Sequence, residues 1–213
     1  GAWSITAQAD GKIVVAGFSN NGSNDDFALI RYNSDGTLDT SFGGGDGIVT
    51  TEPGSGDDVA KIITLQPDGK ILVAGFSNSP NDFVLVRYNI DGTLDTGFGG
   101  GDGIVVTSIT SNSDFADSMT LQDNGKILVA GSMWDGSKEN FAIIRYNSDG
   151  SLDNTFGVTG IVTTAVGTNN DFAYSITLQT DDQILVAGRS GNGTDNDFAL
   201  VRYNTNGTLD NTF

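Results

Sequence analysis

The stretch Ile63–Gly75, ITLQPDGKILVAG, decides the fold. Its Pro-Asp-Gly turn separates two short runs of strand-forming residues, Ile63–Gln66 and Lys70–Gly75, which predicts a tight β-hairpin. The second run is apolar at consecutive positions, and this indicates a strand that is buried on both faces. Two more strands are predicted downstream, at Phe83–Tyr88 and Gly103–Thr107, so one unit is a four-stranded antiparallel meander.

This unit occurs four times in the 213 residues, at spacings of 56, 58 and 57 residues between successive RYN triplets. The triplets begin at Arg31, Arg87, Arg145 and Arg202. Four-stranded meanders at this period predict an all-β fold, a β-propeller of four-stranded antiparallel blades. A sheet with two apolar faces is not stable alone, and stacking of blades buries both faces. A β-solenoid is the main alternative, but its repeats are usually much shorter.

The repeat units span residues 1–57, 58–113, 114–170 and 171–213 of a single propeller. The outer-strand block, GIVTT or GIVVT, occurs only three times, at residues 47–51, 103–107 and 160–164. We therefore expect the last unit to lack its outer strand and the chain to be a segment of a larger propeller. Additional blades or neighbouring subunits are the expected partners of that open edge.

The repeated motifs resemble those of a known family. DFALVRYN at 197–204, GTLDTSFG at 36–43, DGIVTT at 46–51 and ITLQPDGKILVAG at 63–75 resemble the delta-60 repeat family of bacterial propeller-like proteins, over essentially the whole chain. The last motif is more distantly similar to NHL-type propeller blades. The resemblance implies that strand one of each blade is innermost and that the protein is secreted or attached to the cell surface. It supplies no catalytic motif.

The composition excludes several kinds of chemistry. The chain has no histidine and no cysteine, so it has no disulfide, no thiol nucleophile, no His-based triad and no zinc site built from these residues. Its net charge of −17 repels nucleic acid and anionic membranes. The apolar runs are far shorter than the ~20 residues that cross a bilayer, so neither a nucleic-acid partner nor membrane insertion is expected.

Charged residues recur at fixed positions of the repeat. An arginine that alternates with Phe and Leu on strand three lies between blades, where it needs a carboxylate partner. The aspartate after Leu in the following connector is the expected partner. The predicted structural ion pairs are Arg31 with Asp39, Arg87 with Asp95, Arg145 with Asp153 and Arg202 with Asp210.

The connector at residues 33–47 also resembles a calcium loop, because Asn33, Asp35 and Asp39 have the spacing of oxygen ligands. The full D-x-D-x-D-G pattern and its terminal glutamate are missing. An Asp-Gly turn followed by an ordinary connector is the other interpretation. Calcium is the one cofactor that the sequence leaves open.

One position of strand one varies freely while its neighbours do not; its occupants are Trp3, Lys61, Asp117 and Tyr174. In a meander the second turn and the crossing to the next blade lie at one end, and both vary here, for example residues 77–81 against 132–139. The varied position should lie at the same end, near the mouth of the central channel. Trp134 lies in a loop that occurs once, SMWDGSKEN. These residues form either a plain exposed rim or a ligand-binding face.

Three functions compete. A non-enzymatic structural or adhesive module of a larger bacterial surface, secreted or filament protein is the first, with an extracellular or cell-surface location. A lectin-like propeller that binds carbohydrate at the variable-loop face is the alternative, so that protein or carbohydrate is the expected partner there. An enzyme would need facing carboxylates, but Asp25–Asp26 and Asp57–Asp58 are loop neighbours. We therefore expect no enzymatic activity.

Overall fold

The computed structural model describes residues 1–78 and 81–213; residues 79 and 80, within the variable loop 77–81, lie outside the described part. Every regular element of this part is a β-strand, and it holds no helix whose length and apolar character would let it cross a bilayer. The strands are β1 (Ala2–Ala7), β2 (Ile13–Asn20), β3 (Asp25–Tyr32), β4 (Ile48–Thr51), β5 (Asp58–Leu65), β6 (Ile71–Ser77), β7 (Asp82–Tyr88), β8 (Ile104–Thr107), β9 (Asp114–Leu121), β10 (Ile127–Trp134), β11 (Glu139–Tyr146), β12 (Ile161–Thr164), β13 (Asp171–Leu178), β14 (Ile184–Gly191) and β15 (Asn196–Tyr203).

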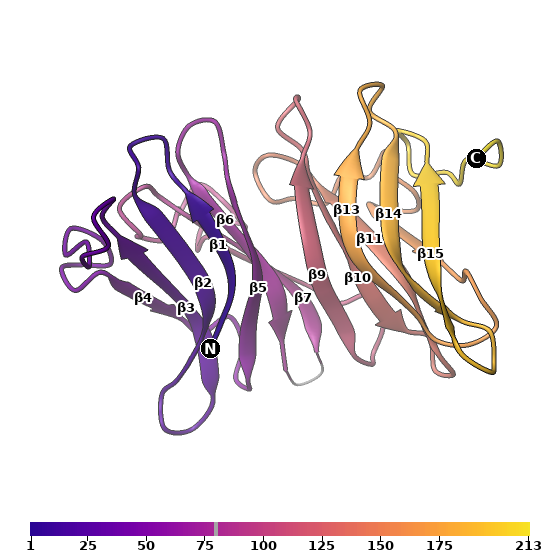
Figure 1. Cartoon of the computed structure of the whole chain (residues 1–213), viewed down its shortest axis with the longest axis horizontal. Coiled ribbons are helices and arrows are strands. Elements are labelled where there is room, and N and C mark those ends of the chain that lie inside the picture. Colours follow the sequence, from indigo (N-terminus) through magenta and orange to yellow (C-terminus); the bar gives the residue numbers. More distant parts are fainter. Residues whose placement is uncertain (79–80) are drawn as a thin grey trace. The chain divides into compact units, whose positions relative to one another are not determined.

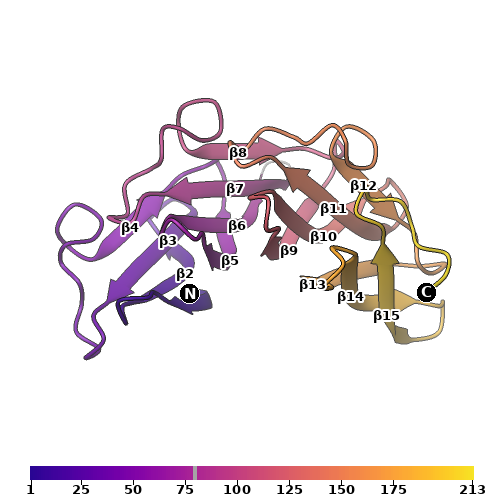
Figure 2. The same ribbon diagram turned by 90° about the horizontal axis from the view of Figure 1, so that it is seen from above.

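The strands form four antiparallel sheets in which neighbours in sequence are neighbours in space (Figure 1). The sheets are β1–β4, β5–β8, β9–β12 and, with three strands, β13–β15. Figure 2 shows β5, β6, β7 and β8 following one another across the second sheet. The predicted all-β fold of repeated meanders is confirmed, and the fourth sheet has three strands as the three outer-strand blocks predict.

The Pro-Asp-Gly turn closes as the sequence predicts. Gln66 and Lys70 pair through the bond from Gln66 N–H to the Lys70 carbonyl at 2.9 Å, and the Lys70 N–H donates to the Asp68 side chain at 3.1 Å. Gly69 has φ of +85°, a left-handed conformation that glycine adopts without strain. The local residues therefore fix the register of the hairpin.

The first strand of each blade is longer than predicted, because pairing continues beyond a β-bulge. In the second sheet Ala60 pairs with Gly75 and Ile62 pairs with Ala74, so Lys61 has no partner across the ladder. A Cβ atom on Gly75 would lie 2.0 Å from the Val59 carbonyl oxygen. The glycine of each VAG triplet is thus required by the close approach of the bulged strand.

The described chain forms two compact units, residues 1–107 and 108–213, each built of two sheets. In the first unit Val14, Phe27 and Leu29 of one sheet pack on Val73 and Val86 of the other. The second unit repeats this packing; its core includes Leu128, Phe141, Ile143, Val186 and Val201. The first strands also meet within each unit, since Ile63 N–H donates to Ser4 Oγ and Ile176 N–H donates to Ser118 Oγ.

Candidate functional site

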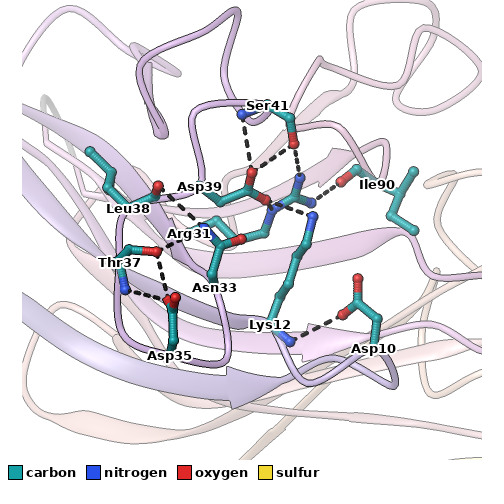
Figure 3. A network of polar contacts seen from close by, with 10 residues as sticks. All are labelled: Asp10, Lys12, Arg31, Asn33, Asp35, Thr37, Leu38, Asp39, Ser41 and Ile90. Atoms are coloured by element: carbon teal, nitrogen blue, oxygen red, sulfur yellow. Dashed lines mark hydrogen bonds and ion pairs between the residues drawn. The ribbon is translucent and has the colours of Figure 1, made fainter.

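The end of each blade that holds the hairpin turn and the connector contains a charge network, which is buried in the first three blades; Figure 3 shows that of the first blade. In the first blade Asp39 Oδ2 accepts hydrogen bonds from Arg31 Nε at 2.7 Å and from Lys12 Nζ at 2.9 Å. Asp39 Oδ1 accepts from the Ser41 hydroxyl at 2.7 Å. Arg31 also donates to the backbone carbonyl of Ile90, in the connector that follows β7, so the network joins a strand, a hairpin turn and a connector of the first blade to the connector of the second.

All four predicted arginine–aspartate pairs are brought together, at 2.6–2.7 Å. A lysine joins the aspartate in three of them, and the sequence had not assigned this role to Lys12, Lys70 and Lys126. The Lys70 ammonium group first, and then the Gly97 N–H and the Arg87 guanidinium, lower the pKa of the Asp95 carboxyl group to about 2. In the fourth blade Gln183 stands in place of the lysine, and its Nε2 lies 3.4 Å from Asp210 Oδ2.

An aromatic ring completes each network. The Arg31 guanidinium lies 4.4 Å from the centroid of the Phe42 ring, and the same contact recurs at 4.3–4.6 Å in the other three blades. Cation–π contacts of this kind are stabilising when the pair is desolvated. The recurring phenylalanine that ends each connector therefore supports the buried arginine.

The proposed calcium ligands take part in separate local contacts. Asp35 Oδ1 accepts from the N–H and hydroxyl groups of Thr37 at 2.9 and 2.6 Å. Asn33 donates to Thr37 Oγ1 and to the Leu38 carbonyl, whereas Asp39 belongs to the ion-pair network. These bonds describe a turn stabilised by its own side chains. The calcium interpretation stays a prediction.

The opposite end of each blade holds the variable loops, as the meander topology predicts. Asn24 in the second turn donates to the Gly56 carbonyl in the crossing loop at 2.6 Å, and Asp25 N–H donates to Asp57 Oδ1 at 3.1 Å. We define this end, with the second turns and crossing loops, as the variable-loop end. Its loops fold against one another within each unit.

The sequence placed Asp58 in a loop and did not single out Asp114 or Asp171, but these three residues form a set of buried carboxylates on strands. Asp58, Asp114 and Asp171 begin β5, β9 and β13, and each is 0% exposed. Asp171 Oδ2 accepts from the backbone N–H groups of Val166 and Gly167, and Asp114 holds its own crossing loop in the same way. Burial raises the pKa of Asp58. The recurrence of an aspartate at the start of three of the four first strands was the available signal.

The varied residues of strand one are the bulged residues of the four sheets. Trp3, Lys61, Asp117 and Tyr174 are the positions that the pairing skips. In the first unit Lys61 Nζ lies 3.6 Å from the centroid of the Trp3 ring, and Trp3 is 57% exposed. Because a bulge turns its extra residue away from the ladder, this position tolerates unlike side chains without harm to the sheet.

A second aromatic and cationic group lies in the second unit. Tyr174 is 50% exposed and stacks on Phe172 at a centroid distance of 6.3 Å. The Arg189 guanidinium lies 4.4 Å above the other ring, that of Phe172. Asp117 is half-buried on β9. Each unit therefore presents an exposed aromatic ring on the bulge of a first strand, with a cation over that ring in the first unit and over the neighbouring Phe172 ring in the second.

Trp134 does not lie in a loop. It is the last residue of β10, pairs with Glu139 and is half-buried. Its backbone N–H donates to the Ser113 carbonyl at 3.1 Å. The prediction of a loop position was wrong because the strands of this hairpin extend further than the apolar run that was used to place them.

Solved structures with the same fold have different activities. The chain is similar to a PL25 ulvan lyase bound to -[GlcA(1-4)Rha3S]-, at 13% identity and a TM-score of 0.57, with 95% of this chain and 55% of that chain covered. It is also similar to a streptogramin B lyase, at 16% identity and a TM-score of 0.51, with 95% and 54% covered. The chain thus spans about half the length of these proteins, and the likeness shows the fold alone. No curated protein matches the sequence.

The residues that match a family model are those that contain the charge networks. A model described as "Domain of unknown function (DUF5122) beta-propeller" matches residues 8–42, 66–98, 122–156 and 179–213. Each match begins at the glutamine before the hairpin turn and ends at the phenylalanine below the arginine. The bulged positions lie outside all four matches. Because the matches cover more than half of the sequence, the chain belongs to the DUF5122 beta-propeller family.

Proposed function

We propose that the protein is a non-enzymatic interaction module, structural or adhesive, of a larger bacterial protein that is secreted or attached to the cell surface. One observation supports this most: the charged residues that recur are engaged in ion pairs, which are buried in three of the four blades, whereas the residues that vary are displayed by the bulges of the first strands. Variable residues on a rigid scaffold are typical of binding surfaces. The resemblance to delta-60 repeats, found in secreted and surface-attached proteins, supports the location.

The absence of enzymatic activity belongs to this proposal. The chain lacks histidine and cysteine, the commonest proton-transfer and thiol groups of enzymes. The buried carboxylates Asp58, Asp114 and Asp171 accept hydrogen bonds from backbone groups of the crossing loops, a role that stabilises structure. These contacts favour a scaffold over a catalytic site.

The test measures retention of the protein on a surface and cleavage of that surface in the same experiment. Beads coated with gelatin and beads of cellulose are incubated with the purified chain, and the bound protein and any soluble products are quantified. The proposal expects saturable retention on at least one surface and no released sugar or peptide. Release of product in proportion to protein, abolished by heat denaturation, contradicts it.

A lectin-like function is the second candidate, and the exposed rings of Trp3 and Tyr174 favour it. Aromatic faces beside polar groups suit the apolar faces and hydroxyl groups of sugars. A net charge of −17 repels anionic polysaccharides, so a neutral glycan is the better ligand. In a Trp134→Phe background Trp3 is the only tryptophan, and its fluorescence is titrated with cello- and manno-oligosaccharides. Saturable quenching supports this function, and an unchanged spectrum with both sugars contradicts it for these ligands.

A further inference from the structure

The carboxamide of Asn192 is held at four points in the turn between β14 and β15. Its Oδ1 atom accepts hydrogen bonds from the backbone N–H groups of Thr194 at 2.9 Å and of Asp195 at 3.1 Å. Its Nδ2 atom donates to the carboxylates of Asp195 at 2.5 Å and of Asp197 at 2.8 Å. The carboxamide is thus folded back onto the backbone that follows it, which begins with Gly193.

The backbone N–H of Gly193 differs from that of the other glycines that follow an asparagine. The chain has four Asn-Gly steps, which begin at Asn21, Asn124, Asn192 and Asn206. The N–H of Gly22 donates to Asn20 Oδ1 at 2.9 Å. The N–H groups of Gly125 and Gly207 donate to backbone carbonyls at 2.9 and 2.8 Å. Among the described residues nothing accepts a hydrogen bond from the N–H of Gly193, so this nitrogen alone of the four is unengaged.

The equivalent turn of the first blade, between β2 and β3, shows the cause of this difference. Asn21 Oδ1 accepts from the N–H groups of Ser23 at 2.8 Å and Asn24 at 3.2 Å, as Asn192 does in its own turn. Both turns expose their Asn-Gly step to solvent. The first turn is preceded by Asn20, whose side chain binds the glycine N–H, whereas Gly191 occupies that position in the fourth blade and has no side chain to bind it.

We propose that Asn192 is a site of spontaneous deamidation, at which the backbone nitrogen of Gly193 attacks the Asn192 side chain. The bond from that nitrogen to Cγ forms and the Cγ–Nδ2 bond breaks, while the proton of the attacking N–H passes through solvent to the leaving nitrogen, which departs as ammonia. Water then opens the resulting succinimide to aspartate or isoaspartate. The two N–H groups on Oδ1 stabilise the negative charge that develops on this oxygen during attack. Glycine has no Cβ atom that would hinder the attack.

The product would disturb the turn in which it forms. Asn192 donates to two carboxylates, and an aspartate in its place would be a third carboxylate beside Asp195 and Asp197, where like charges repel. The third blade shows the opposite match: Asp135 occupies this position, and Asn140, at the position of Asp197, donates to it at 2.7 Å. Deamidation therefore removes two hydrogen bonds and loosens one turn of the variable-loop end. The proposal is independent of what that end binds.

The experiment follows all four Asn-Gly steps in one sample. The folded chain is incubated at neutral pH, and peptide mass spectrometry quantifies asparagine, aspartate and isoaspartate at each step. We expect Asn192 to react faster than Asn21, Asn124 and Asn206 by about two- to tenfold, the rate equivalent of one net hydrogen bond on the attacking nitrogen. In urea, where the turns are unfolded, the four rates should become similar. The proposal is overturned if Asn192 reacts no faster than the other three in the folded chain, or if the same preference persists in urea.

A matched pair of variants tests the role of the preceding residue. Asn20→Gly reproduces in the first blade the Gly-Asn-Gly sequence of residues 191–193 and should speed the reaction at Asn21, with Asn124 as the internal reference. Gly191→Asn should slow the reaction at Asn192. A Cβ atom on Gly191 would lie 2.9 Å from Asn169 Cβ, so Asn20→Gly, which adds no atom, is the decisive variant. Circular dichroism verifies that both variants are folded, and an unchanged rate at Asn21 in Asn20→Gly overturns the proposal.

Discussion

Arg87 and Asp95 are joined twice, through their side chains and through their backbones. Arg87 Nε lies 2.7 Å from Asp95 Oδ2, and the Asp95 N–H donates to the Arg87 carbonyl at 2.9 Å. The seven residues between them, 88–94, are thereby closed into a loop at the end of strand β7. The equivalent pairs in the other blades have the same two bonds. Each connector is therefore attached to its third strand at the same repeat position.

Removal of the arginine should strongly destabilise the protein. Arg87→Ala removes the more deeply buried of the two cations that contact the Asp95 carboxylate, and breaking a buried pair in this way costs about 3–5 kcal/mol of unfolding free energy. The side chain of Arg202 is 20% exposed against 9% for Arg87, so we expect a smaller loss in Arg202→Ala. Urea unfolding of both variants measures the difference; equal, small losses would contradict a structural role.

In the fourth blade an ion pair can be added instead of removed. Gln183 occupies the position of the lysines that bind Asp39, Asp95 and Asp153 in the other networks. Gln183→Lys should add the missing ion pair with Asp210 and stabilise the protein by up to about 1 kcal/mol, since the pair is partly exposed. Gln183→Met controls for the longer apolar stem. A lysine variant that is no more stable than the methionine variant would show that the lysine of these networks does not stabilise the protein.

The networks also predict loss of stability in acid. The ordinary pKa of an aspartate is about 3.9. The contacts with Lys70, Gly97 and Arg87 lower the pKa of Asp95 to about 2 in the folded protein. Because the folded pKa is the lower one, the stabilisation is complete above about pH 4 and is lost as the pH falls towards 2. The difference in urea midpoint between the parent protein and Asp95→Asn should therefore shrink across this range. A constant difference from pH 5 to pH 2 would contradict the assignment.

The bulge predicts which glycines are essential. Gly75→Ala would place a methyl group 2.0 Å from the Val59 carbonyl oxygen, so the bulged strand must move. We expect a loss above about 3 kcal/mol, or failure to fold. Gly97→Ala is the matched control, because its φ is ordinary and the nearest atom, Asp95 Oδ1, lies 3.3 Å away. Comparable thermal midpoints for the two variants would show that the bulge is not rigid.

Much of this architecture could be predicted from the sequence, because the repeat multiplies each local signal. The Asp68–Gly69 turn, the strand after it and the Arg87–Asp95 pair follow from residue types at fixed spacing. The bulge at Lys61 could not be predicted, since a bulge leaves no mark in the hydrophobic pattern except the glycine opposite it. Trp134 was misplaced for a related reason: polar residues continue a strand when a neighbouring strand pairs with them, and the sequence does not show that pairing.

In the proposed function the recurring charges stabilise the blades, and the bulged residues form the binding surface. The most direct measurement is the retention of a Trp3→Ala, Tyr174→Ala double variant on gelatin-coated and cellulose beads, with its thermal midpoint measured in parallel. Both side chains are at least half exposed, so the midpoint should stay within about 2–4 °C of the parent value while retention is lost. Retention equal to that of the parent protein, at an unchanged midpoint, would contradict the claim.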